Sequence, residues 1–122
     1  MTKAAAVQKF FEGFGLTAYE ENTVPVGAKF PYLTYPLMTD SFGERLQISF
    51  SLWYRSDLWS AINAKTEYIS SKIGRGGATI DCDGGYIEIN RGSPFAQSMG
   101  DPSDDKIKRK VISLEFEFIT LD

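Results

Sequence analysis

Apolar and polar residues alternate most regularly in two segments of the chain. The segment "RLQISFSLWYR" (residues 45–55) has an apolar side chain at every second position from Leu46 to Tyr54. The segment "KVISLEFEFITLD" (residues 110–122) has the same alternation from Ile112 to Phe118. Strict alternation is typical of a strand that packs one face on a core and turns the other outward. Both segments are therefore predicted to be long, half-buried strands.

Two other segments have the spacing of amphipathic helices. Apolar residues at intervals of three and four, after a possible N-cap at Thr2, predict a helix over residues 3–13. Ser56 or Asp57 is placed to cap a second helix, which should end at the glycines of "GRGG" (residues 74–77). Its apolar positions fall on one stripe: Leu58, Ala61, Ile62, Ile69 and Ile73.

The remaining segments predict strands, turns and one long loop. "ATIDCDGGYIEIN" (residues 78–90) has the pattern of a hairpin with its turn at residues 83–85. Residues 30–37 alternate but include Pro31 and Pro36, which favours an edge or irregular strand, rather than a central one, that pairs on one side only. The next segment, residues 91–110, is predicted to be a long loop. The order predicts one α+β domain over residues 1–122, with two helices on one face of a mixed, mainly antiparallel sheet.

The composition supports a folded domain and argues against several classes of function. The chain has 122 residues, 43% hydrophobic residues and a net charge of −3, which suits a single core and gives no overall attraction to nucleic acid or anionic membranes. No apolar run reaches the roughly 18 residues that span a bilayer. Charges interrupt the amino terminus too early for a signal peptide, so we expect a protein made and used in the cytoplasm, or in a particle assembled there.

The residue types needed for catalysis are scarce. The sequence has no histidine, which removes the commonest general base and most zinc sites. The single cysteine, Cys82, lies in an alternating strand, where a packing role is favoured over reactivity. Asp101, Asp104 and Asp105 lack the spacing of a calcium loop, and the glycine-rich segments lack that of a phosphate loop. We therefore expect no enzymatic activity, no metal and no cofactor.

Basic and aromatic residues remain as candidates for binding. In the run "KIKRK" (residues 106–110) a strand would place the three lysines on one side and Ile107 and Arg109 on the other. The run has no aromatic neighbours in the sequence to stack bases, so nucleic-acid binding is only a third candidate function. Trp53 points away from the predicted core face, which leaves either a covering segment or a subunit interface as its environment.

Several segments together resemble the small tail terminator proteins of long-tailed bacteriophages, also called tail completion or head-tail joining proteins. They are "FPYLTYPL" (residues 30–37), "LWYRS" (52–56), "LWSAINAK" (58–65) and, most specifically, "IEINRGSPFAQSMGDPSDDKIKRKVISLEFEF" (87–118). The resemblance covers residues 10–119. It implies an α+β fold and a structural role in the virion, without a reaction or a cofactor.

The resemblance also implies partners and a location. Tail terminators form a ring, usually a hexamer, on the last ring of the tail tube; the ring stops polymerisation of the tube protein and joins the tail to the head connector or stopper. DNA passes through the lumen without specific binding, and no membrane is involved. The expected location is the head-proximal end of the virion tail, assembled in the host cytoplasm. The candidate interface residues are Trp53, Arg91, Phe95, Gln97, Met99, Asp101, Asp104, Asp105, Lys106, Lys108 and Arg109.

Residues 91–106 are expected to act as an arm that contacts a neighbouring subunit or the tube, ordered in the ring and mobile in the free subunit. Phe95 and Met99 would be its apolar anchors, and the charges that follow would fix its register. The alternative is a small ligand-binding α+β domain without catalytic activity. Its pocket would be lined by four aromatic side chains: Tyr32, Tyr35, Phe50 and Tyr54.

Overall fold

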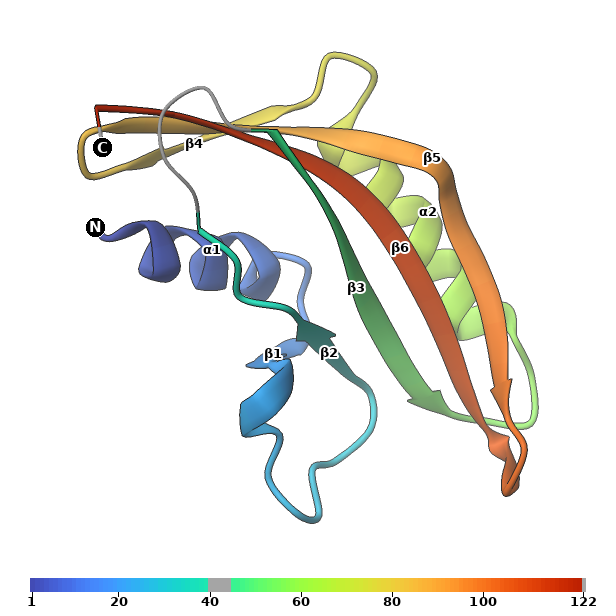
Figure 1. The fold of residues 1–122 in the computed structure, drawn as a ribbon. Coiled ribbons are helices and arrows are strands. Elements are labelled where there is room, and N and C mark those ends of the chain that lie inside the picture. Colours follow the sequence, from blue (N-terminus) through green and yellow to red (C-terminus); the bar gives the residue numbers. More distant parts are fainter. Residues whose placement is uncertain (40–44, 122) are drawn as a thin grey trace.

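A computed structural model describes residues 1–39 and 45–121 of the chain. These residues form two helices, one short 3-10 helix and six strands (Figure 1). In order these are α1 (Lys3–Glu12), β1 (Thr17–Glu20), η1 (Glu21–Thr23), β2 (Tyr32–Tyr35), β3 (Arg45–Arg55), α2 (Ser60–Ile73), β4 (Ala78–Cys82), β5 (Gly85–Asp101) and β6 (Asp104–Thr120).

The strands form one curled, mixed sheet in the order β1-β2-β3-β6-β5-β4. In the described part of the chain, β1 and β2 pair in parallel, and the other neighbouring strands pair antiparallel. Both helices pack on the same face, where Phe10 of α1 meets Phe116 and the start of α2 meets β6. The predicted α+β fold with a mainly antiparallel sheet and helices on one face is confirmed.

The two strands with the clearest alternation form the centre of the sheet. β3 and β6 pair antiparallel along their length, with Ile48 opposite Leu114 and Phe50 opposite Ile112. These four side chains are fully buried beneath the helices. The residues between them lie on the opposite face of the sheet, which neither helix covers; we call it the helix-free face. The predicted burial of one face of each strand is confirmed.

Helix α1 fills the gap between the two edges of the curled sheet. Figure 1 shows α1 lying between β4 and β1, and it contacts both strands. Thr2 caps α1 as predicted, because its Oγ1 accepts from the amide of Ala5 at 3.1 Å. The side-chain amide of Gln8 donates to the carbonyl of Ala18 at 2.9 Å, so α1 satisfies part of the open edge of β1. Phe11 is fully buried in the core.

Helix α2 begins later than the sequence predicted. Ser56 Oγ accepts from the amide of Leu58 at 3.1 Å, which forms a local turn, and the helix starts at Ser60 after Trp59. Leu58 is 66% exposed and does not belong to the buried stripe, and Ala61 is also exposed. Serine side chains favour such turns as readily as helix caps, which explains the error. The rest of the stripe is buried as predicted: Ile62, Ile69 and Ile73.

Two predictions about strand pairing need correction. The segment with prolines is not an edge, because β2 pairs with β1 on one side and with β3 on the other. It avoids both prolines by being short, with Pro31 before it and Pro36 after it. The true edge next to it, β1, lies in a segment for which no strand was predicted. The predicted hairpin is confirmed, since β4 and β5 pair across a turn at residues 83–84.

The long loop predicted over residues 91–110 is wrong. This segment is the distal half of a β5–β6 hairpin, in which β5 runs to Asp101 and β6 starts at Asp104. The pairing has one irregularity near the tip, between Gly100 opposite Lys108 and Asp101 opposite Asp104, and a second one between Arg91 opposite Leu114 and Ala96 opposite Ile112. Residues 92–95 therefore bulge out beside the single residue Ser113. The glycine, proline and charged residues of this segment break the alternation by which a strand is recognised in a sequence. The segment still forms a strand because it pairs with the long antiparallel strand β6.

Candidate interface at the tip of the hairpin

The paired residues beyond the bulge, 96–110, form a β-hairpin that we call the arm. Figure 1 shows its tip extending past the end of β3. Ser56 donates its amide to the carbonyl of Lys106 at 2.7 Å, and this bond joins the arm to the chain just after β3. Of the expected arm, residues 91–106, the part from residue 96 onward belongs to this hairpin, and residues 92–95 form the bulge before it. Whether it is mobile in the free subunit stays a prediction.

A row of aromatic and cationic side chains crosses the helix-free face at the base of the arm tip. The register places Trp53 of β3 between Tyr32 of β2 and Arg109 of β6, with Met99 of β5 beyond Arg109. The Arg109 guanidinium lies 4.7 Å from the centroid of the Trp53 ring, and the Tyr32 ring stacks on the other side at 6.2 Å. These contacts bury Trp53 partly, without a covering helix.

The aromatic row continues toward the sheet edge. The ring of Tyr32 lies 5.8 Å from that of Tyr19 and 5.2 Å from that of Phe30. All three residues are half-buried, so part of each ring faces solvent. Burial raises the pKa of the Tyr32 hydroxyl, which stays protonated and able to donate a hydrogen bond. Half-exposed tyrosine, tryptophan and arginine in one patch is the composition that protein interfaces favour.

A shallow groove lies at the arm end of this row. It has a volume of about 210 Å³ and is lined by Trp53, Met99, Pro102, Ile107 and Arg109, with Asp101 at its rim. Met99 is the most exposed large apolar side chain of the arm, with 46% of its surface accessible. We call this hollow the tip groove.

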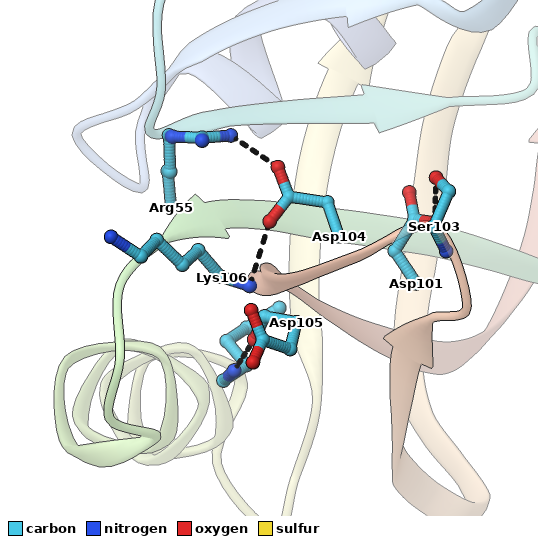
Figure 2. A network of polar contacts seen from close by, with 7 residues as sticks. Arg55, Asp101, Ser103, Asp104, Asp105 and Lys106 are labelled. Atoms are coloured by element: carbon cyan, nitrogen blue, oxygen red, sulfur yellow. Dashed lines mark hydrogen bonds and ion pairs between the residues drawn. The ribbon is translucent and has the colours of Figure 1, made fainter.

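The turn of the arm is held by its aspartates. Asp101 Oδ1 accepts from the amide and the hydroxyl of Ser103 at 2.8 and 2.7 Å. Asp104 accepts from the amide of Lys106 at 2.9 Å and forms an ion pair with Arg55 of β3 at 2.7 Å (Figure 2). The hydrogen bonds of Ser103 lower the pKa of Asp101, and the Lys106 amide together with Arg55 lowers that of Asp104.

The other side of the arm packs on Trp59, just before α2. The ammonium groups of Lys108 and Lys110 each lie 5.6 Å from the centroid of the Trp59 ring. Lys110 also donates to Ser98 Oγ at 2.7 Å, and Lys108 donates to the carbonyl of Asp105. Desolvation lowers the pKa of Lys110. Lys108 is only 8% exposed.

This packing corrects the statement that the basic run has no aromatic neighbours. The aromatic rings come from other strands and loops, and the sequence pattern around residues 106–110 could not reveal them. The predicted division of the run is confirmed, since Lys108 and Lys110 face Trp59 while Arg109 faces the opposite side. Because Lys108 is buried within its own chain, it is poorly placed for phosphate contacts.

The candidate interface residues fall into four groups. Trp53, Gln97, Met99 and Arg109 share the helix-free face. Asp101, Asp104, Asp105 and Lys106 belong to the turn, and Lys108 packs on the helix side. Arg91 and Phe95 lie outside the arm. Arg91 donates to Ser70 Oγ of α2 at 2.8 Å, and Phe95 packs partly against the core, so it is not a free anchor.

Sequence reasoning missed the contribution of β2 and its neighbours to this surface. Tyr32 was assigned to a ligand pocket with Tyr35, Phe50 and Tyr54. In the structure Tyr35 and Phe50 are buried in the core, whereas Tyr32 lies on the opposite face of the sheet. The four side chains therefore do not line one pocket. In residues 32–35, Tyr32 and Thr34 alternate with Leu33 and Tyr35, which puts Tyr32 and Tyr35 on opposite faces of a strand. This alternation could have placed Tyr32 on the same face as Trp53 of the neighbouring strand.

The described residues offer little for other chemistry. Across residues 1–39 and 45–121, no group of three or more histidine, cysteine, aspartate or glutamate side chains is arranged to hold a metal ion. Cys82 is half-buried, and desolvation raises the pKa of its thiol, which disfavours the nucleophilic thiolate. In the part of the chain that the structure describes, neither helix is long and apolar enough to span a membrane.

Comparison with known proteins gives no further assignment: no protein-family model, no curated protein and no solved structure matches this chain.

Proposed function

We propose that this chain is the subunit of a phage tail terminator ring, which caps the head-proximal end of the tail tube and joins it to the head connector. The observation that supports the proposal most is the arm, a projecting hairpin whose tip groove exposes Met99 beside Trp53 and Arg109. Aromatic residues, methionine and arginine are enriched where protein surfaces bind each other. The kind of assembly that we propose, a ring on the tail tube, rests on the resemblance of the sequence to tail terminators.

A ring is consistent with the asymmetry of this subunit. Cyclic assemblies other than dimers use heterologous contacts, in which one patch meets a different patch of the next copy. The arm extends from one end of the sheet, and the aromatic row runs from its base to Tyr19 and Phe30, away from the arm. A closed ring requires each copy to contact the next through one surface and the previous one through a different surface. We propose a hexamer.

The partners in this proposal are the tail tube protein on one side of the ring and the connector or stopper protein on the other. DNA would cross the lumen without specific binding, which agrees with a net charge of −3. The basic side chains of the arm also make contacts within their own subunit, as Lys110 does with Ser98. Binding of this surface to proteins is therefore favoured over binding to nucleic acid.

Electron microscopy of the purified protein, alone and mixed with tail tubes assembled from the tube protein of the same phage, tests the proposal. The expected result is a ring density at one end of each tube and an arrest of tube elongation. A variant with the tip groove blocked, Met99→Arg, provides the comparison. A protein that stays monomeric and leaves tube ends bare and growing would refute the proposed function.

A further inference from the structure

A rigid turn between η1 and β2 presents an apolar side chain to solvent. The amide of Ala28 donates to the carbonyl of Pro25 at 3.1 Å, and Gly27 has a φ of +83°, so residues 25–28 form a β-turn with glycine in its left-handed position. Val26 sits at the corner of this turn and is fully exposed. Nothing in the turn itself explains an apolar residue there, and Lys29 follows it.

The tip groove has the shape and charge to receive such a turn. Its lining includes the apolar side chains of Met99, Pro102 and Ile107, the carboxylate of Asp101 and the guanidinium of Arg109. Arg109 is engaged within its own chain by the Trp53 ring and by Ser51, which leaves the Asp101 carboxylate to attract a cation. The bonds from Ser103 keep that carboxylate in one position. A valine side chain matches the apolar walls, and a lysine three positions later matches the carboxylate. Complementary charge beside an apolar anchor fixes the register of a protein contact.

The groove and the turn of one molecule are not in contact. Figure 1 shows the segment between η1 and β2 well apart from the tip of the β5–β6 hairpin, although both lie at the same end of the molecule. A contact between them must therefore join two copies. Such a contact is heterologous, because each copy contributes a different patch to it, and repetition around an axis closes a ring.

We propose that Val26 of one copy seats in the tip groove of the next, with Lys29 of the first copy beside Asp101 of the second. This inference rests on the proposed function, since it assigns a contact within the proposed ring. Among the large apolar side chains of the described residues, Val26 is the most exposed, ahead of Leu121 and Leu58. Leu58 lies in the connection between β3 and α2, and Leu121 adjoins the end of the chain. A rigid turn loses little conformational freedom when it binds.

Cysteine cross-linking tests the contact directly. In a Cys82→Ser background, the variant Val26→Cys/Met99→Cys should form disulfide-linked oligomers on oxidation, up to a closed ring, both in solution and on tail tubes. Each single variant should give at most linked dimers. The pair Val26→Cys/Glu67→Cys, with the second cysteine on the exposed side of α2, is the matched control and should not form the ladder.

A charged substitution gives a second readout that does not depend on disulfide geometry. Val26→Asp should weaken self-association about tenfold or more, measured by analytical ultracentrifugation, because it replaces an apolar contact with the groove by a carboxylate that loses hydration among apolar side chains. Leu58→Asp, which adds the same charge at another exposed apolar position, should associate like the unchanged protein. Circular dichroism should be unchanged for both variants.

Three results would overturn the inference while leaving the proposed function intact. The first is normal rings with no cross-linked ladder and normal assembly of Val26→Asp. The second is normal rings from Val26→Asp that no longer bind tubes, which would make the tube protein the occupant of the groove or the partner of the turn. The third is an equal loss of association in Leu58→Asp. Failure to self-associate both in solution and on tubes would refute the inference and the ring together.

Discussion

The guanidinium of Arg109 lies 4.7 Å from the centroid of the Trp53 ring, and its Nε donates to Ser51 Oγ at 3.1 Å. Strand β6 supplies the arginine and strand β3 the tryptophan, so the contact depends on the pairing of the two strands. It fixes both side chains on the helix-free face before any partner binds. Residues held in this way bind at a lower entropic cost.

Arg109→Ala should lower the free energy of unfolding of the monomer by about 1 kcal/mol, because a partly exposed cation–π contact and one hydrogen bond are lost. Assembly of the proposed ring should fall much further, since the variant also removes a charged side chain that lines the tip groove. Denaturant unfolding and sedimentation measure the two effects. Arg75→Ala, at an exposed position after α2, is the control for the loss of one arginine and should affect neither measurement.

Phe95→Ala should destabilise the monomer, contrary to the sequence-based view of Phe95 as a free anchor. The side chain is partly buried against the core, so its truncation should cost about 1–3 kcal/mol, below the range for a fully buried phenylalanine. Met99→Ala, at an exposed position of the arm, should change the free energy of unfolding by less than about 0.5 kcal/mol. Equal stability of the two variants in urea would contradict this assignment.

The ion pair and amide bond of Asp104 should make the stability of the arm depend on pH. The pKa of Asp104 lies below its ordinary value of 3.8 in the folded chain, so the folded state binds this proton less readily than the unfolded state. The contribution is therefore present above pH 3.8 and is lost as the pH falls through the lowered pKa.

Asp104→Asn tests this dependence. The difference in unfolding free energy between the unchanged protein and the variant should be constant near neutral pH and shrink in strong acid. Urea unfolding at several pH values measures it. Asp57→Asn, in the exposed segment before α2, controls for the loss of one negative charge. A difference for Asp104→Asn that grows with acidity would show that the sign is wrong.

The bulge of β5 depends on a close approach at Gly92. A Cβ placed there would lie 2.8 Å from Ser113 Cβ and 2.9 Å from the Ser113 carbonyl oxygen, closer than such atoms come in folded proteins. Gly92→Ala should therefore cost about 1–3 kcal/mol and loosen the start of the arm. Gly100→Ala is the matched control in the same strand, because a Cβ there meets nothing within 4 Å. Thermal unfolding of the two variants should separate them clearly.

The sequence predicted the arm as a candidate interface but not its form. Arg109 and Met99 were chosen from a segment whose composition is unusual for a loop, and their identity was informative before their geometry was known. Their partnership with Trp53 and Tyr32 could not be predicted, because side chains on four strands meet only through the register of the sheet. Phe95 was wrongly predicted to be an exposed anchor, because its burial depends on what the bulge at residues 92–95 packs against.

The sequence alone determined the elements with strong periodicity, namely the two central strands, both helices and the first hairpin, because alternation and helical spacing record which side of an element is buried. It also showed that the residue types most often used in catalysis are scarce. Only the tertiary structure decided that residues 91–110 are strands, that β2 lies inside the sheet, and that a groove opens beside Trp53. Each of these depends on pairing between distant segments, which local preference does not encode.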